Sequence, residues 1–141
     1  MTARLLKAPV HLLLVAALVV PATFAMAGPA SAGGAPERRL LSMVNDERAH
    51  QNLRALDMSG RLSRRAERNS REMARSRELS HSGNLRSGMA ENVGVATTLR
   101  SIVRMWMRSP DHRRNILGNH RLAGVGVDKA AGLFWVTLIL R

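Results

Sequence analysis

Apolar side chains recur at helical spacing through the middle of the chain. Residues 37–52 show this spacing, which predicts a first helix there. Residues 60–77 show it more clearly, because one face carries apolar side chains and Asn69 while the opposite face carries arginines. The first of these faces consists of Leu62, Ala66, Asn69 and Met73. The pattern therefore predicts two long helices, each packed against a core by one face.

A third helix and a short fourth helix are predicted after residue 97. Thr97 or Thr98 can cap the third helix, because a threonine hydroxyl accepts a hydrogen bond from an amide of the first turn. Its apolar residues, at i, i+3, i+4 and i+7, are Leu99, Ile102, Val103 and Trp106. The helix is expected to end before Pro110, since the residue before a proline is disfavoured in the helical conformation. Ser109 then becomes the N-cap of a short helix through Leu117, with Pro110 in its first turn.

The end of the chain has the composition of strands. The runs "LAGVGVD" and "GLFWVTLIL" are rich in residues that favour strands and are separated by "KAAG", which predicts an antiparallel hairpin. The run "NVGV", which begins at Asn92, is a candidate third strand. Trp106 and Trp135 fall on the apolar sides of their elements and are expected in the core. Helices followed by a small antiparallel sheet indicate an α+β domain.

The first 32 residues have the pattern of a secretory signal peptide. A basic start is followed by the apolar run "LLLVAALVV" and by small residues that end in "ASA". An uncleaved membrane anchor is the alternative, but this run is well short of the roughly 18 to 20 apolar residues that span a bilayer. The chain therefore divides into a signal peptide at residues 1–32, a short linker at 33–37 and one domain at 38–141. Cleavage after Ala32 would release a secreted domain, which has no cysteine for a disulfide.

The chain is strongly basic, with a formal net charge of +12 from 22 basic and 10 acidic residues. Six arginines lie on one face of the helix predicted over residues 60–77, opposite its apolar side. They are Arg61, Arg64, Arg65, Arg68, Arg71 and Arg75. This face predicts attraction to anionic cell-wall polymers or lipid headgroups, and it does not indicate a specific nucleic-acid partner. A solvated surface that keeps a small protein soluble would have the same pattern.

Three residues of the types that bind metals or transfer protons occur in small or polar surroundings. They are His81, Glu91 and His112. His81 follows the second predicted helix in a serine- and glycine-rich turn, which can direct an imidazole inward. The spacing of the three residues is too loose for a metal signature, because no pair lies on one helix face.

Other polar residues are expected to have surface or structural roles. His50 and His120 stand among charged or polar neighbours and are expected at the surface. Asn45, Arg48 and Asn115 are expected to fix loops through hydrogen bonds between their side chains and the backbone.

Six motifs occur in an order that resembles a known family. They are "NDERAHQNLRAL", "LSHSG", "AENVG", "MWMRSPDHRRNIL", "AGVGV" and "LFWVT". Together they cover about residues 40–140 and resemble the bacterial branch of the CAP superfamily, which includes cysteine-rich secretory proteins, antigen five and plant pathogenesis-related proteins. The resemblance implies an α-β-α sandwich with a small antiparallel sheet. It also implies a central cleft of histidines and acids, which in some members holds a divalent metal such as zinc.

The resemblance implies that His81, Glu91 and His112 line this cleft, with Asn92 and Ser109 beside them. His81 and Glu91 resemble the family's first cleft histidine and first glutamate, and His112 resembles the histidine of the bacterial "SP-x-H" motif. Two histidines and one carboxylate would provide three zinc ligands with an open fourth position. Eukaryotic members usually carry a second glutamate three residues after the tryptophan, where this chain has Ser109. Without that acid, no general base remains beside the three residues.

These observations favour a secreted binding module without catalytic activity, whose cleft takes a ligand or a metal. A metal-assisted hydrolase that uses the same cleft is one alternative, with Ser82 or Ser109 as the candidate nucleophile. A polyanion-binding protein that uses the arginine face is the other. The sequence leaves the ligand and the oligomeric state open.

Overall fold

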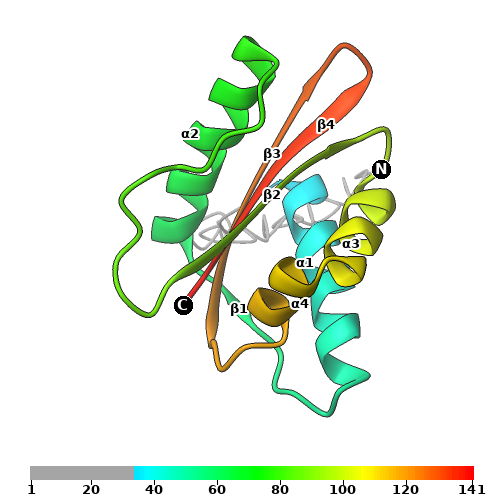
Figure 1. Cartoon of the computed structure of the whole chain (residues 1–141), viewed down its shortest axis with the longest axis vertical. Coiled ribbons are helices and arrows are strands. Elements are labelled where there is room, and N and C mark those ends of the chain that lie inside the picture. The colour runs from blue at the N-terminus through cyan, green and yellow to red at the C-terminus, as the bar shows by residue number, and fades with distance from the viewer. Residues whose placement is uncertain (1–33) are drawn as a thin grey trace, which may run out of the picture.

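A mixed sheet lies between one helix and three others in the computed structural model, which describes residues 34–141 (Figure 1). The predicted signal peptide at residues 1–32 lies outside the described residues. The first helix, α1 (Ala35–Ala49), begins inside the segment that the sequence predicts as a linker. Pro36 stands in its first turn, where the missing amide of a proline costs no helical hydrogen bond.

The four predicted helices are confirmed, with ends that differ by at most a few residues. After α1 come α2 (Gly60–Ser76), α3 (Leu99–Arg108) and α4 (Pro110–Ile116). Thr98 is the cap of α3, because its hydroxyl accepts a hydrogen bond from the amide of Ser101 at 3.1 Å. Ser109 stands at the N-cap position of α4, but its hydroxyl accepts no hydrogen bond from a backbone amide of the helix. None of the helices described within residues 34–141 is long and apolar enough to cross a membrane.

The sheet contains the three predicted strands and one that the sequence pattern missed. Its order is β1 (Asp57–Met58), β3 (Leu122–Ala130), β4 (Leu133–Leu140) and β2 (Ala90–Ala96). The strands β2, β3 and β4 pair antiparallel as predicted, whereas the two-residue β1 pairs parallel with β3. The sheet is therefore mixed. The sequence pattern missed β1, because a strand this short has no period of its own and depends on a partner that is distant in sequence.

The hairpin turn is tighter than the predicted "KAAG" connection. Ala130 pairs directly with Leu133, so that only Ala131 and Gly132 form the turn. Both have positive φ, at 51° and 76°. Two such residues make the type of turn whose twist matches that of the flanking strands. Lys129 and Ala130 therefore belong to β3 and not to the connection.

The two faces of the sheet carry separate groups of buried side chains. The helices α1, α3 and α4 cover one face, where Trp106 is the largest fully buried side chain, and α2 covers the other (Figure 1). Under α2, one cluster joins Leu62 and Ala66 to Ile139 of β4, and a second joins Met73 to Trp135. Both tryptophans are buried, which confirms their predicted place in the core.

The helix α2 lies in direct contact with the backbone of β3. A Cβ atom at Gly124 would lie 2.2 Å from the carbonyl carbon of Leu62, and one at Gly126 would lie 2.2 Å from that of Ala66. Such distances are far below ordinary van der Waals contact, and the obstructing atoms are helix backbone that cannot turn aside. The glycines of "AGVGV" therefore determine how closely α2 approaches the sheet.

We expect Gly126→Ala to destabilise the domain by about 3 kcal/mol, because the added methyl group must push α2 away from β3. Gly94→Ala is the comparison, because its Cβ would meet side-chain atoms of Ile102 and Trp106 at 3.0 and 3.1 Å, a smaller overlap than the one with helix backbone at Gly126. Thermal unfolding of both variants measures the difference. Equal losses at the two positions would contradict the special closeness of α2 and β3.

Candidate functional site

Glu91 is a buried carboxylate on β2 that accepts hydrogen bonds from the loop after α2. Its side chain is 1% exposed, and its Oε1 lies 2.8 Å from both the His81 Nδ1 and the backbone amide of Ser82. The hydroxyl of Ser82 donates to Oε2. A carboxylate oxygen accepts hydrogen bonds, so the His81 Nδ1 is the donor in this contact. The His81 side chain is 62% exposed, and its ring is therefore accessible from solvent.

The helix α2 binds the same loop from the other side. Asn69 donates to the carbonyl of Ser80 at 3.0 Å and to the hydroxyl of Thr137 on β4 at 3.1 Å. Arg65 donates to the hydroxyl of Ser82 at 3.2 Å and to the carbonyl groups of Ser82 and Gly83. Residues 80–83, here called the 80–83 loop, are thus held between α2 and β2.

His112 is held on the opposite face of the sheet from Glu91. Neighbouring side chains of a strand point to opposite faces, and Asn92 follows Glu91 directly on β2. The Asn92 side chain donates to the carbonyl of His112 at 3.0 Å and accepts from Asn115 at 2.9 Å. The His112 Nδ1 lies 2.9 Å from the hydroxyl of Ser109. The predicted cleft residues therefore form two groups, with Glu91 and His81 on one face and the other three on the other.

The zinc set predicted from the sequence is not brought together in this arrangement. Within residues 34–141 there is no group of three or more histidine, cysteine, aspartate or glutamate side chains that could hold a metal ion. Both oxygens of Glu91 already accept hydrogen bonds from His81 and Ser82. The donor set in this part of the chain therefore does not fit a three-ligand zinc site.

The six predicted arginines are not equivalent in the fold. Arg61, Arg64, Arg68, Arg71 and Arg75 are exposed along α2, as the helical pattern predicts. Arg65 is half-buried, because its guanidinium group lies against the 80–83 loop. A pocket of about 420 Å³ beside this loop is lined by Arg65, Arg68, Asn69, Glu72 and Ser82.

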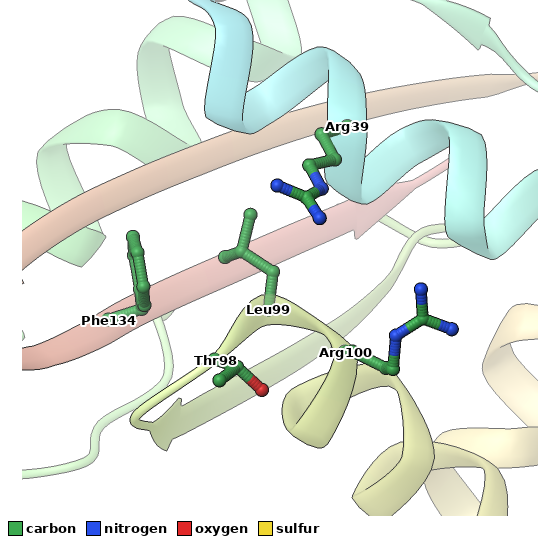
Figure 2. A pocket seen from close by; sticks show the side chains of 5 residues that line it. All are labelled: Arg39, Thr98, Leu99, Arg100 and Phe134. Carbon is green, nitrogen blue, oxygen red and sulfur yellow. The ribbon is translucent and has the colours of Figure 1, made fainter.

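Another pocket lies on the face of the sheet away from α2. Figure 2 shows it between α1, the start of α3 and β4, lined by Arg39, Thr98, Leu99, Arg100 and Phe134. Its volume is about 330 Å³, and its apolar walls are Leu99 and Phe134. None of the residues predicted to carry chemistry lines it. It is therefore separate from the site around Glu91.

Arg48 joins the loop after α1 to the end of α4 and the loop after it, as its predicted structural role requires. It is 2% exposed and donates to the carbonyl groups of Arg54, Ile116, Gly118 and His120. Burial lowers the pKa of Arg48, although a guanidinium group stays protonated in proteins. Asn45 exchanges hydrogen bonds with the backbone of Leu56, at 2.8 and 3.1 Å. The loop-fixing roles predicted for these two residues are confirmed.

The predicted surface position is right for His50 and wrong for His120. His50 is exposed, whereas His120 is half-buried beside Arg48. Burial lowers the pKa of His120, and the positive charge of Arg48 lowers it further. The polar neighbours of His120 in the sequence gave no sign that a buried arginine from α1 lies beside it.

The contacts around the 80–83 loop went largely unpredicted. One signal was present, because Asn69 is a polar residue on the apolar face of its helix, and such a residue needs a hydrogen-bond partner when it packs. Arg65 gave no signal, because it belongs to a row of similar arginines. The separation of Glu91 from His112 follows from the two-residue period of β2, once Asn92 is placed against α4.

Solved structures with this fold come from bacteria and from a eukaryote. An outer surface protein of Borrelia burgdorferi matches 73% of this chain and 89% of its own, with a TM-score of 0.64 and 17% identity. An extracellular protein containing an SCP domain from Bacillus anthracis matches 74% of this chain, with a TM-score of 0.65 and 19% identity, and this chain spans 39% of it. Venom allergen-like protein 4 of Schistosoma mansoni matches 77% of this chain and 88% of its own, with a TM-score of 0.60 and 11% identity. These likenesses define the class of fold, the α-β-α sandwich of SCP domains.

The sequence defines the family within this class. The model of the cysteine-rich secretory protein family, CAP, matches residues 41–139. The chain therefore belongs to the CAP family. No curated protein matches it significantly.

We expect Glu91→Gln to destabilise the domain by about 1 to 3 kcal/mol, because a neutral amide cannot accept all the hydrogen bonds of the 80–83 loop. Glu78→Gln is the matched control, since Glu78 is an exposed acid just before the same loop. Chemical denaturation measures both. The role assigned to Glu91 would be refuted by equal stabilities of the two variants.

We expect His120 to make the domain less stable in acid. Its pKa in the folded state lies below the usual value of about 6.5, so the unfolded chain binds more protons in this window. The stability that arises from this difference in the pKa of His120 is fully present above about pH 6.5 and is lost as the pH falls towards the lowered pKa. Between about pH 7.5 and pH 5, the melting temperature of His120→Gln should fall less than that of the wild type. Parallel curves of melting temperature against pH for the two proteins would show that His120 has no part in the acid sensitivity.

Proposed function

We propose that the chain is a secreted, non-catalytic binding module of the cell envelope or the extracellular space. Its ligand-contacting surface is the exposed side of α2 together with the 80–83 loop. Secretion is supported by the signal-like pattern of residues 1–32 and by similar structures described as extracellular or outer-surface proteins. One observation supports binding over catalysis: the buried carboxylate of Glu91 already accepts hydrogen bonds from the 80–83 loop and holds it in place.

The parts needed for nucleophilic catalysis are divided between the two faces of the sheet. His81 has an orienting carboxylate in Glu91, but Ser82 donates its hydroxyl to Glu91, and no hydrogen bond links that hydroxyl to an imidazole in the described residues. Ser109 has an imidazole partner in His112, but no acidic side chain orients that ring in the described residues. A serine hydrolase needs nucleophile, base and acid in one connected chain. This division favours binding over hydrolysis.

The second candidate function, metal-assisted hydrolysis, has less support. The predicted ligands are not free to meet at one metal ion, because both Glu91 oxygens accept hydrogen bonds and the carbonyl of His112 is held by Asn92 on the other face of the sheet. Peptide or ester hydrolysis by the wild type that Glu91→Gln abolishes, with its fold intact, would contradict the non-catalytic role.

The ligand class that we propose is an anionic cell-wall polymer or lipid headgroup. Five of the six predicted arginines are exposed along α2, and their charges can attract an anionic surface. The helix α3 offers a matched comparison, because Arg100, Arg104 and Arg108 form an exposed row on the other side of the sheet. If net charge alone caused binding, the two rows would contribute equally.

We expect the triple variant Arg64→Gln, Arg71→Gln, Arg75→Gln to bind linear polyphosphate more weakly than the wild type. Each lost contact removes roughly 0.7 to 0.9 from the slope of log affinity against log salt, so the slope should fall by about 2 to 3. A matched triple variant on α3 removes the same charge and should leave most of this salt dependence unchanged; its substitutions are Arg100→Gln, Arg104→Gln and Arg108→Gln. Salt-dependent retention on immobilised polyphosphate measures both. Equal effects of the two triple variants would show that the arginine face of α2 is only a solvated surface and not a binding site.

A further inference from the structure

A pocket of about 250 Å³ gathers arginines from three separate parts of the chain. Arg61, Arg65 and Arg68 line it from α2, where their i, i+4 and i+7 spacing brings them to one side of the helix. Arg86, from the segment between α2 and β2, and Arg141, directly after β4, line it from elsewhere in the chain. Sequence patterning finds the α2 row alone, because the other two arginines approach it only in the fold.

Most of these charges have no partner within the protein. In the described part of the chain, the guanidinium groups of Arg61, Arg68, Arg86 and Arg141 take part in no hydrogen bond or ion pair, and none of the side chains that line the pocket is acidic. Arg65 is the exception, since the 80–83 loop holds it in place. Like charges that line one pocket repel each other, so an anion bound between them would relieve the repulsion.

The pocket also has an apolar wall. Leu62, Met89 and Leu122 line it, and the same three side chains belong to one packed apolar cluster beneath α2. An inorganic ion would leave this wall in contact with water only. A ligand that carries a small organic group beside its anionic group would cover it and remove apolar surface from water.

We propose that this pocket binds a phosphate ester with a small organic substituent, such as a glycerol phosphate unit. Guanidinium groups match phosphate oxygens through paired, charge-assisted hydrogen bonds. The pocket is smaller than the roughly 300 to 1,000 Å³ of sites for drug-sized ligands, which restricts the bound part to one such unit. This inference rests on the proposed binding role and names the chemical group that is bound. The unit occurs both in soluble or polymeric glycerol phosphates and in lipid headgroups.

The test is calorimetric titration of the whole domain with glycerol 3-phosphate and with inorganic phosphate at fixed ionic strength. The pocket variant is Arg68→Gln with Arg86→Gln, and the control is Arg104→Gln with Arg108→Gln on α3, which removes the same charge. We expect the wild type to bind the ester more tightly than inorganic phosphate. We expect the pocket variant to lose at least about tenfold in ester affinity, or 1.4 kcal/mol, while the control stays within about twofold. Melting temperatures verify that both variants are folded.

A second arm distinguishes the two sources of the ligand. Vesicles of phosphatidylcholine that contain phosphatidylglycerol present the same unit as a headgroup. Binding to these vesicles but not to the soluble ester, lost in the pocket variant alone, would support the phosphate-ester site and assign it to lipid. Binding of the soluble ester, lost in the same variant, would support the site and assign it to soluble or polymeric phosphates.

Two results would overturn the inference. One is equal loss of ester affinity in the pocket variant and the control, which would indicate diffuse attraction to net charge. The other is no binding of the wild type to either the ester or the vesicles. If the wild type still binds polyphosphate through Arg64, Arg71 and Arg75 in that case, the proposed function stands and only the pocket assignment fails.

Discussion

The contact between α2 and the glycines of β3 is the constraint on which the rest of this domain depends. With no side chains at Gly124 and Gly126, the helix backbone lies directly on the strand. At this distance Ser70 of α2 bonds to the carbonyl of Gly126 at 2.8 Å, and Asn69 reaches Thr137 of β4. The same placement lets α2 and Glu91 hold the 80–83 loop from opposite sides. The geometry of the candidate site thus follows from two missing Cβ atoms.

Much of the fold could be predicted from the sequence, because the elements that were found have strong local patterns. The apolar spacing of α3, its threonine cap and the proline that follows it all act within a few residues. The strand β1 could not be found this way, because two residues have no period and their pairing with β3 is a tertiary contact. The extent of the hairpin strands was underestimated, because Ala131 does not have the sequence signature of a residue at positive φ.

The contact between Glu91 and His81 could be expected from the sequence, but the place of His112 relative to them could not. Glu91 and His81 were expected together and lie 2.8 Å apart, between the Oε1 and Nδ1 atoms. His112 was grouped with them through its residue type, its local context and a family resemblance, and none of these gives the side of a strand on which a residue lies. The adjacent positions of Glu91 and Asn92 on β2 determine those sides. This arrangement explains why residue types that occur in catalytic centres are here divided between the two faces of the sheet.

The buried carboxylate of Glu91 holds the 80–83 loop against the sheet. The backbone amide of Ser82 reports on it directly, because it donates to the Glu91 Oε1 at 2.8 Å in a loop with no strand or helix of its own. Amide hydrogen exchange followed by NMR measures how often that bond opens. We expect the Ser82 amide to be protected in the wild type and to lose its protection in Glu91→Gln, while amides of β4 stay protected. Exchange of the Ser82 amide at the rate of an unstructured peptide in the wild type would show that Glu91 does not hold the loop.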